Sequence, residues 1–199
     1  MLKIKGDDIF NSCTSLTSVS IPAGWESIPL GMFYNCSSLK TVTIPNTVTS
    51  IGVEYRRGVF DGCTSLTSIN IPESVTFIGD NTFRNCSSLS SIQFPCSVAR
   101  IGSSCFENCI SLKDVKLSDS ITEIPNHAFY NCSSLPEIII PTKVTTINWW
   151  HAFGNCQSLK KIVIPESVTT IVQDAFTNES DLFTSPDLVI YGKTNSEAH

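Results

Sequence analysis

Apolar and polar residues alternate in short stretches along this chain, and the same stretch returns at nearly constant intervals. In one copy, Ile69 and Ile71 alternate with Ser68 and Asn70. This two-residue period is typical of a β-strand with one buried and one exposed face. Proline has no N–H to donate to a further ladder bond, so the strand is expected to end at Pro72.

The second half of the same unit predicts a return path around a core. Residues 75–78 (Val-Thr-Phe-Ile) indicate another short extended segment, and Gly79 allows a tight corner. Residues 80–83 are too few for a full helix and suit a single 3₁₀ or α turn. Two residues after each phenylalanine stands Asn, Gly or Ser, and Asn and Gly best tolerate the left-handed conformation that ends such a turn.

The unit recurs through most of the chain. One phenylalanine marks each copy, at Phe10, Phe33, Phe60, Phe83, Phe106, Phe129, Phe153 and Phe176. Successive phenylalanines are 23 residues apart, except for one interval of 27 and one of 24. A period in this range indicates a solenoid, in which each unit buries its apolar side only against its neighbours.

Length and composition fit one elongated domain over residues 1–199, with repeats from about 10 to 176 and a degenerate last repeat or C-terminal cap over 177–199. Charged residues make up only 16% of the chain and the net charge is −5, without a basic patch. Nucleic acid is therefore a poor candidate partner. No apolar run approaches the ~20 residues that a membrane helix needs.

The N-terminal sequence MLKIKGDDIF resembles neither a secretory signal nor a transit peptide. It opens just before the phenylalanine of a repeat. Two explanations remain, a cytoplasmic protein or a trimmed piece of a longer one. The missing start of the first unit favours the trimmed piece.

Cysteine follows seven of the eight phenylalanines by three residues, at Cys13, Cys36, Cys63, Cys86, Cys109, Cys132 and Cys156. In a solenoid these residues form a column whose parallel side chains stay too far apart for the short Cβ separation of a disulfide. Their expected role is that of small buried hydrophobic residues. Cys105 is expected to be buried as well, and Cys96 to be the exposed thiol.

The sequence gives no sign of catalysis, a metal site or a cofactor. Its three histidines, His127, His151 and His199, lie in different units, and no carboxylate is paired with them at a fixed spacing. No nucleophile elbow, zinc-protease motif, phosphate-binding loop or dinucleotide fingerprint occurs. We therefore expect a protein that is not an enzyme and that needs no cofactor.

The full pattern, LxxIxIPxxVxxIGxxxFxxCxSL, resembles the BspA-like class of leucine-rich repeats, found in surface antigens of bacteria and some protists. The resemblance implies a right-handed leucine-rich-repeat solenoid of the α/β horseshoe class, rich in β-structure. We expect about eight repeats of about 23 residues, a parallel sheet on the concave face, and short strands and 3₁₀ turns on the convex side. The stretch Leu188–Gly192 resembles a final strand of such arrays. The family further implies an extracellular, surface-attached, ligand-binding role.

The outward positions of the main sheet form one candidate binding platform. They are small, polar and uncharged in the N-terminal half. In the C-terminal half they carry charges of both signs, at Asp114, Lys116, Glu137 and Lys161. No aromatic residue, the type that binding hot spots favour, occurs among them. A solvated sheet face without a ligand therefore remains an equal alternative.

The two longer intervals supply the other candidate residues. Tyr55, Arg56 and Arg57 belong to the four-residue insertion, and Trp149 and Trp150 to the one-residue insertion. Both insertions follow the second extended segment, four units apart, which places them on one edge about 20 Å apart at sheet spacing. Our hypothesis is that this edge is the contact surface. The alternative is that one tryptophan tucks under its own loop.

These observations favour a non-enzymatic, surface-exposed, adhesin-like module that binds a host or extracellular-matrix protein. Two alternatives stay open. One is a glycan-binding module that stacks sugar rings on Trp149, Trp150 and Tyr55. The other is a structural spacer inside a larger surface protein.

Overall fold

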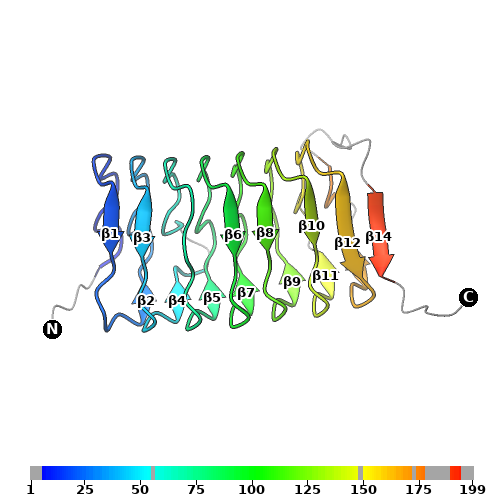
Figure 1. Cartoon of the computed structure of the whole chain (residues 1–199), viewed down its shortest axis with the longest axis horizontal. Helices are drawn as coiled ribbons and strands as arrows, with labels where there is room; N and C mark the ends of the chain where they lie inside the picture. The colour runs from blue at the N-terminus through cyan, green and yellow to red at the C-terminus, as the bar shows by residue number, and fades with distance from the viewer. Residues whose placement is uncertain (1–5, 55–56, 148–149, 172–173, 178–188, 194–199) are drawn as a thin grey trace, which may run out of the picture.

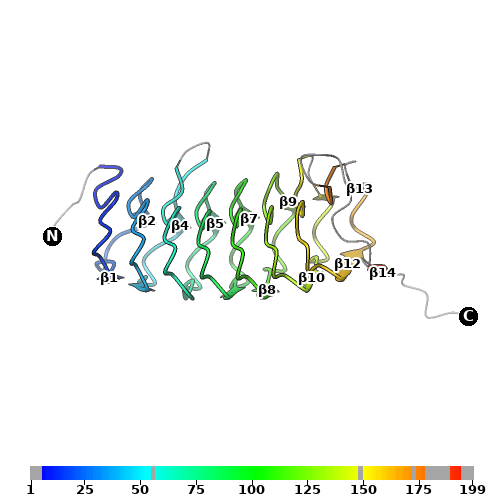
Figure 2. The same cartoon turned by 90° about the horizontal axis from the view of Figure 1, so that it is seen from above.

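The computed structural model describes residues 6–54, 57–147, 150–171, 174–177 and 189–193. The chain winds into a solenoid whose turns stack side by side along the long axis of the molecule (Figure 1). Two ladders of parallel strands run along this axis, one on each side of the turns (Figure 2). The described residues contain strands and turns but no α-helix. The solenoid expected from the repeat is therefore confirmed.

The main ladder contains the strands predicted from the alternating pattern. Its members are β1 (Ser18–Ser20), β3 (Thr41–Thr43), β6 (Ser91–Gln93), β8 (Asp114–Lys116), β10 (Glu137–Ile139), β12 (Lys161–Pro165) and β14 (Val189–Lys193). Paired strands stand in the register of the repeat, as with Val19 opposite Val42. β14 pairs in parallel with β12, so the final strand expected near the C-terminus is present.

The second ladder supplies one short strand per turn. Its members are β2 (Ser27–Ile28), β4 (Ser50–Ile51), β5 (Phe77–Ile78), β7 (Arg100–Ile101), β9 (Glu123–Ile124), β11 (Thr146–Ile147) and β13 (Thr170–Ile171). The two insertions follow β4 and β11, at the same corner of their turns. Their predicted position in the unit is therefore correct.

Phenylalanine rings fill the centre of the solenoid in one continuous stack. Neighbouring rings from Phe10 to Phe176 have centroids 5.3–5.7 Å apart and planes within 12° of parallel. Aliphatic side chains of both ladders surround this stack and are almost wholly buried. Because each ring packs on the rings before and after it, one turn cannot bury its core alone.

The residue two positions after each phenylalanine adopts the expected left-handed conformation. Among the described copies this holds for Ser12, Asn35, Gly62, Asn85, Asn108, Asn131 and Asn155, with φ between 56° and 78°. The expected short turns lie just before these residues and have the three-residue hydrogen-bond spacing of a 3₁₀ helix. In one of them the N–H of Arg84 donates to the carbonyl of Asn81. A left-handed residue in each turn prevents these turns from continuing into a helix.

Asparagine side chains at this position form a hydrogen-bonded row along the solenoid. Each amide nitrogen donates to the side-chain oxygen one turn earlier, over distances of 2.7–2.9 Å. The row runs from Asn155 through Asn131, Asn108 and Asn85 and ends on the carboxylate of Asp61. Asp61 is only 5% exposed. Burial raises the pKa of its carboxyl, while the hydrogen bond from Asn85 opposes the rise.

The cysteine column is buried, with one exception. Cys13 in the first turn is exposed, whereas the other six members are buried. Each of these six thiols lies 3.0–3.2 Å from the carbonyl oxygen of the phenylalanine in the preceding turn. Cys13 has no preceding turn among the described residues. Cys105 is buried and Cys96 exposed, as predicted.

Proline residues interrupt both ladders at neighbouring turns. The main ladder is broken between β8 and β10, where Pro136 precedes β10. In the flanking turns the residue at this position donates its N–H to the previous turn, as Lys113 does to Ser90 and Lys160 to Pro136. Proline cannot make this bond. Pro125 likewise stands where other turns have a donating glycine, and the second ladder is broken between β7 and β9.

The main ladder has a further gap at residues 68–70, which form no assigned strand. The expected alternation is still present, because Ile69 is 9% exposed and Ile71 is 5% exposed. Ser68 and Asn70 point outward. Side-chain burial is thus retained where strand pairing is lost.

Candidate functional site: a groove on the main ladder

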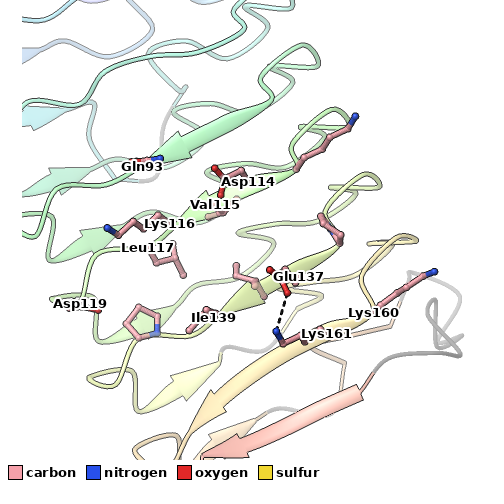
Figure 3. Close-up of a pocket in the computed structure, with 14 residues that line it drawn as sticks. Gln93, Asp114, Val115, Lys116, Leu117, Asp119, Glu137, Ile139, Lys160 and Lys161 are labelled. Atoms are coloured by element: carbon pink, nitrogen blue, oxygen red, sulfur yellow. Dashed lines mark hydrogen bonds and ion pairs between the residues drawn. The ribbon is translucent and has the colours of Figure 1, made fainter.

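A groove of about 670 Å³ lies on the outer face of the main ladder, where the ladder is interrupted. Gln93 of β6, residues of β8, β10 and β12 and the segments that flank these three strands line it (Figure 3). The groove therefore reaches across four successive turns, from that of β6 to that of β12.

The floor of the groove is apolar. Leu117 and Ile138 are 6% and 2% exposed, and Val115 of β8 is half-buried. Ile139 is 63% exposed, which is unusual for a large aliphatic side chain. In Figure 3 it lies between the side chains of β8 and those of β12. An apolar group from another molecule can therefore be covered here.

Charged side chains surround this apolar floor. The groove is lined by four lysines and three carboxylates: Lys113, Lys116, Lys160, Lys161, Asp114, Asp119 and Glu137. Lys161 and Glu137 stand opposite each other on paired strands, and their Nζ and Oε2 atoms are 3.1 Å apart. Such an exposed pair contributes little to stability, typically under ~1 kcal/mol. Among the described residues this is the only ion pair within the lining.

The groove coincides with a missing backbone bond at Pro136. Without an N–H at this residue, Lys113 O receives no bond from the next turn within the described structure. At the other end of the strands, Phe94 and Ile140 donate to the following turn, but Leu117 makes no such bond to Ile139. β8 and β10 are thus held together by packing rather than by a hydrogen-bonded ladder.

The structure brings all four charged platform residues to this one groove. Asp114 and Lys116 come from β8, Glu137 from β10 and Lys161 from β12. Five further lining residues were not predicted from the sequence: Lys113, Lys160, Asp119 and the two prolines, Pro136 and Pro141. The two lysines occupy the repeat position just before the strand, so extending the platform by one position would have found them.

The insertion residues are only partly described. Tyr55, Arg56 and Trp149 lie outside the described residues. Arg57 is held by its own chain: its guanidinium is 3.5 Å from the carboxylate of Asp8 and 4.9 Å from the ring centroid of Tyr34. Trp150 is 63% exposed and lies beside His127. Within the described ranges no contact joins Arg57 to Trp150, and a shared binding edge remains a hypothesis.

The described residues of the inserted segment after β4 are packed against neighbouring turns on both sides. Arg57 reaches back to the first turns, whereas Glu54 forms an ion pair with Arg100 of β7. A side chain on Gly79 would approach the backbone of Val53 to 2.5 Å. Contacts within the protein therefore fix part of this segment.

The described residues show neither a cluster of metal ligands nor a membrane-spanning helix. Across the described ranges, no three His, Cys, Asp or Glu side chains come together as potential metal ligands. The same ranges contain no helix with the length and apolarity that a bilayer crossing requires.

The repeat identifies the family. Residues 3–56 and 53–182 match the family described as BspA type leucine rich repeat region, in six copies. The chain belongs to this family. The BspA-type resemblance seen in the sequence is therefore confirmed, and the family supports a repeat module for protein interaction.

Solved bacterial leucine-rich-repeat proteins have the same architecture. A protein from Bacteroides ovatus is 29% identical over 94% of this chain, with a TM-score of 0.72. The leucine-rich-repeat protein of T. pallidum is 32% identical over 84% of this chain and 78% of its own length, with a TM-score of 0.75. A leucine-rich cell surface protein from Faecalibacterium prausnitzii is 29% identical over 95% of this chain, with a TM-score of 0.58.

The BspA-type chain spans only part of some of these proteins. It covers 54% of the B. ovatus chain and 63% of the F. prausnitzii chain. No protein of curated function matches it.

Proposed function

We propose that this BspA-type solenoid is a non-enzymatic, surface-exposed module that binds a host or extracellular-matrix protein through the groove on β8, β10 and β12. The observation that carries the proposal is the exposed Ile139 above an apolar floor, surrounded by lysines and carboxylates. An apolar centre with a charged rim is the usual anatomy of a protein–protein contact. Rim charges of both signs favour a partner surface that also carries both.

The surface location draws support from the family and from the F. prausnitzii relative, which is described as a cell surface protein. Most of the lining residues stand on strands rather than on long loops, which gives the groove a rigid support although β8 and β10 share no hydrogen-bonded ladder. A rigid site loses little conformational entropy on binding.

The test is a binding screen of the folded chain against purified extracellular-matrix proteins. Two variants change the groove, Ile139→Asp at its centre and Lys116→Glu at its rim. The matched control is Thr43→Glu, which places a charge at the same strand position of β3, outside the groove. We expect a partner whose affinity falls at least about tenfold, ~1.4 kcal/mol, in both groove variants and stays unchanged in the control. A role for the groove would be refuted if the wild type, the two groove variants and the control all bound the partner with equal affinity.

A further inference from the structure

Four ring side chains from two adjacent turns form a patch at the corner that follows the second ladder. The rings belong to His127, Tyr130, Trp150 and His151. Trp150 is 63% exposed, and its ring centroid lies 6.4 Å from that of His127. The centroid of His127 is in turn 5.4 Å from Tyr130 and 5.8 Å from His151, and Tyr130 and His151 are 6.1 Å apart.

The backbone holds this patch in place. His127 and His151 both stand two residues before a core phenylalanine and have left-handed φ values of 53° and 50°. Equal positions in successive turns are neighbours in a solenoid, so the two imidazoles meet although 24 residues separate them. The N–H of His127 also donates to the carbonyl of Trp150 at 2.8 Å. The rings are thus arranged before any ligand arrives.

One imidazole has a fixed hydrogen-bonding pattern. The Nδ1 atom of His151 lies 2.9 Å from the carbonyl oxygen of Thr177. A carbonyl only accepts, so Nδ1 carries the hydrogen in this contact, and Nε2 is the acceptor of the neutral ring. The patch therefore combines flat apolar ring faces with polar atoms at their edges.

The chemistry of the patch suits a sugar ring better than other ligands. None of the four side chains is a carboxylate, an ammonium or a guanidinium, so the patch offers little to a charged ligand. Nucleobases also stack on aromatic rings, but a chain of net charge −5 disfavours a polyanion. A protein partner needs about 800 Å² on each side, far more than four rings supply. A pyranose ring has an apolar C–H face for Trp150 and hydroxyl groups for the polar edges.

We propose that Trp150, with His127, Tyr130 and His151, binds a neutral saccharide chain. The site goes beyond the protein-binding role proposed above. It shares no residue with the lining of the groove, so each proposal can fail without the other.

The test is native electrophoresis of the folded chain through gels that contain one soluble polysaccharide each. The panel holds neutral β-glucan, mannan, xylan and galactan, with an anionic uronate polymer for comparison. We expect at least one neutral polymer to retard the protein, and Trp150→Ala to raise the dissociation constant about tenfold or more. Trp150→Phe keeps a ring and is expected to retain part of the retardation.

Two controls separate the sites. Ile139→Asp changes the groove and is expected to leave the retardation intact, as is Trp25→Phe, which changes a tryptophan far along the chain. Circular dichroism checks that each variant is folded. Retardation by no neutral polymer, or equal retardation of Trp150→Ala, would overturn the proposal. If Trp150→Ala instead lost the binding of a protein ligand, the patch would be assigned to protein binding, and the saccharide proposal would be overturned as well.

Discussion

The thiol of Cys109 donates a hydrogen bond to the carbonyl oxygen of Phe83 in the preceding turn, over an Sγ–O distance of 3.1 Å. The same pairing recurs at each buried member of the cysteine column. Each thiol is thus both a small apolar group in the core and a weak donor to a carbonyl one turn away. The cysteine column and the phenylalanine stack support each other.

Thiol-specific reagents are expected to separate the nine cysteines into two classes. Seven are buried, and burial raises the pKa of the Cys156 thiol to about 12 and that of Cys86 well above its usual value. The thiolate is the reactive form of cysteine. The buried thiols are therefore protected from the reagent twice, because the core excludes the reagent and because the raised pKa keeps them protonated. We expect two thiols, Cys13 and Cys96, to react with a chromogenic disulfide in the native protein and all nine in denaturant.

The double variant Cys13→Ser/Cys96→Ser supplies the control for this assignment. It is expected to show no fast-reacting thiol in the native state. Rapid reaction of a third thiol in the native wild-type protein would contradict the burial of the column.

Asp61 is expected to make stability depend on pH. Burial raises the pKa of its carboxyl above the ordinary 3.8. The folded state therefore binds this proton more tightly than the unfolded state does, and the resulting stability is present in acid and is lost as pH rises through the raised pKa. Asp61→Asn retains an oxygen that accepts from Asn85 but carries no charge. We expect this variant to be more stable than the wild type at pH 7, with the difference disappearing below about pH 4.

Urea unfolding between pH 3 and pH 8 measures this difference. Asp119→Asn removes the same charge from an exposed position and is the matched control. A stability gain of equal size in Asp119→Asn would assign the effect to net charge rather than to the burial of Asp61.

Much of this fold could be predicted from the sequence because the same pattern of residue types recurs from repeat to repeat. The outward Ser68 and inward Ile69, and the left-handed Asn85, follow from residue type and spacing alone. Two of the three ladder breaks in the described residues were also readable, since Pro136 and Pro125 stand where other turns have N–H donors, whereas no proline marks the break at residues 68–70. The proximity of His127 and His151 follows from their equal positions in the repeat, a signal that our sequence analysis did not use.

Other features depend on geometry that the repeat does not encode. Arg57 contacts Asp8 and Tyr34, which lie in earlier turns. These contacts depend on the path of the inserted segment. The groove depends on how two turns pack once a backbone bond is missing. Spacing placed its four charged residues on one face, but it did not show that an apolar floor lies between them.

Gly58 tests whether the inserted segment is packed as tightly as the structure indicates. A Cβ atom at this position would lie 1.7 Å from the carbonyl oxygen of Asn81, a distance at which backbone has to move. We expect Gly58→Ala to lower the free energy of unfolding by about 1–3 kcal/mol, as overpacking usually does. Val53→Ala changes an exposed side chain of the same segment and is expected to stay within about 0.5 kcal/mol of wild type. Equal stability of the two variants would show that the segment does not lie against Asn81.

Pro136 offers a direct test of how the groove arises. Pro136→Ala restores an N–H at the position from which Lys113 and Lys160 donate to their preceding turns. A new bond to the carbonyl of Lys113 contributes about 1 kcal/mol, while the freer unfolded chain costs about 0.4–1 kcal/mol. The two effects nearly cancel, so we expect little change in overall stability.

Hydrogen exchange is the informative measurement: the new amide at position 136 is expected to be protected as strongly as that of Lys160. A partner bound in the groove is expected to lose affinity as β8 and β10 draw together. An unprotected amide at position 136 would show that side-chain packing around Ile139, and not the missing donor, keeps these strands apart.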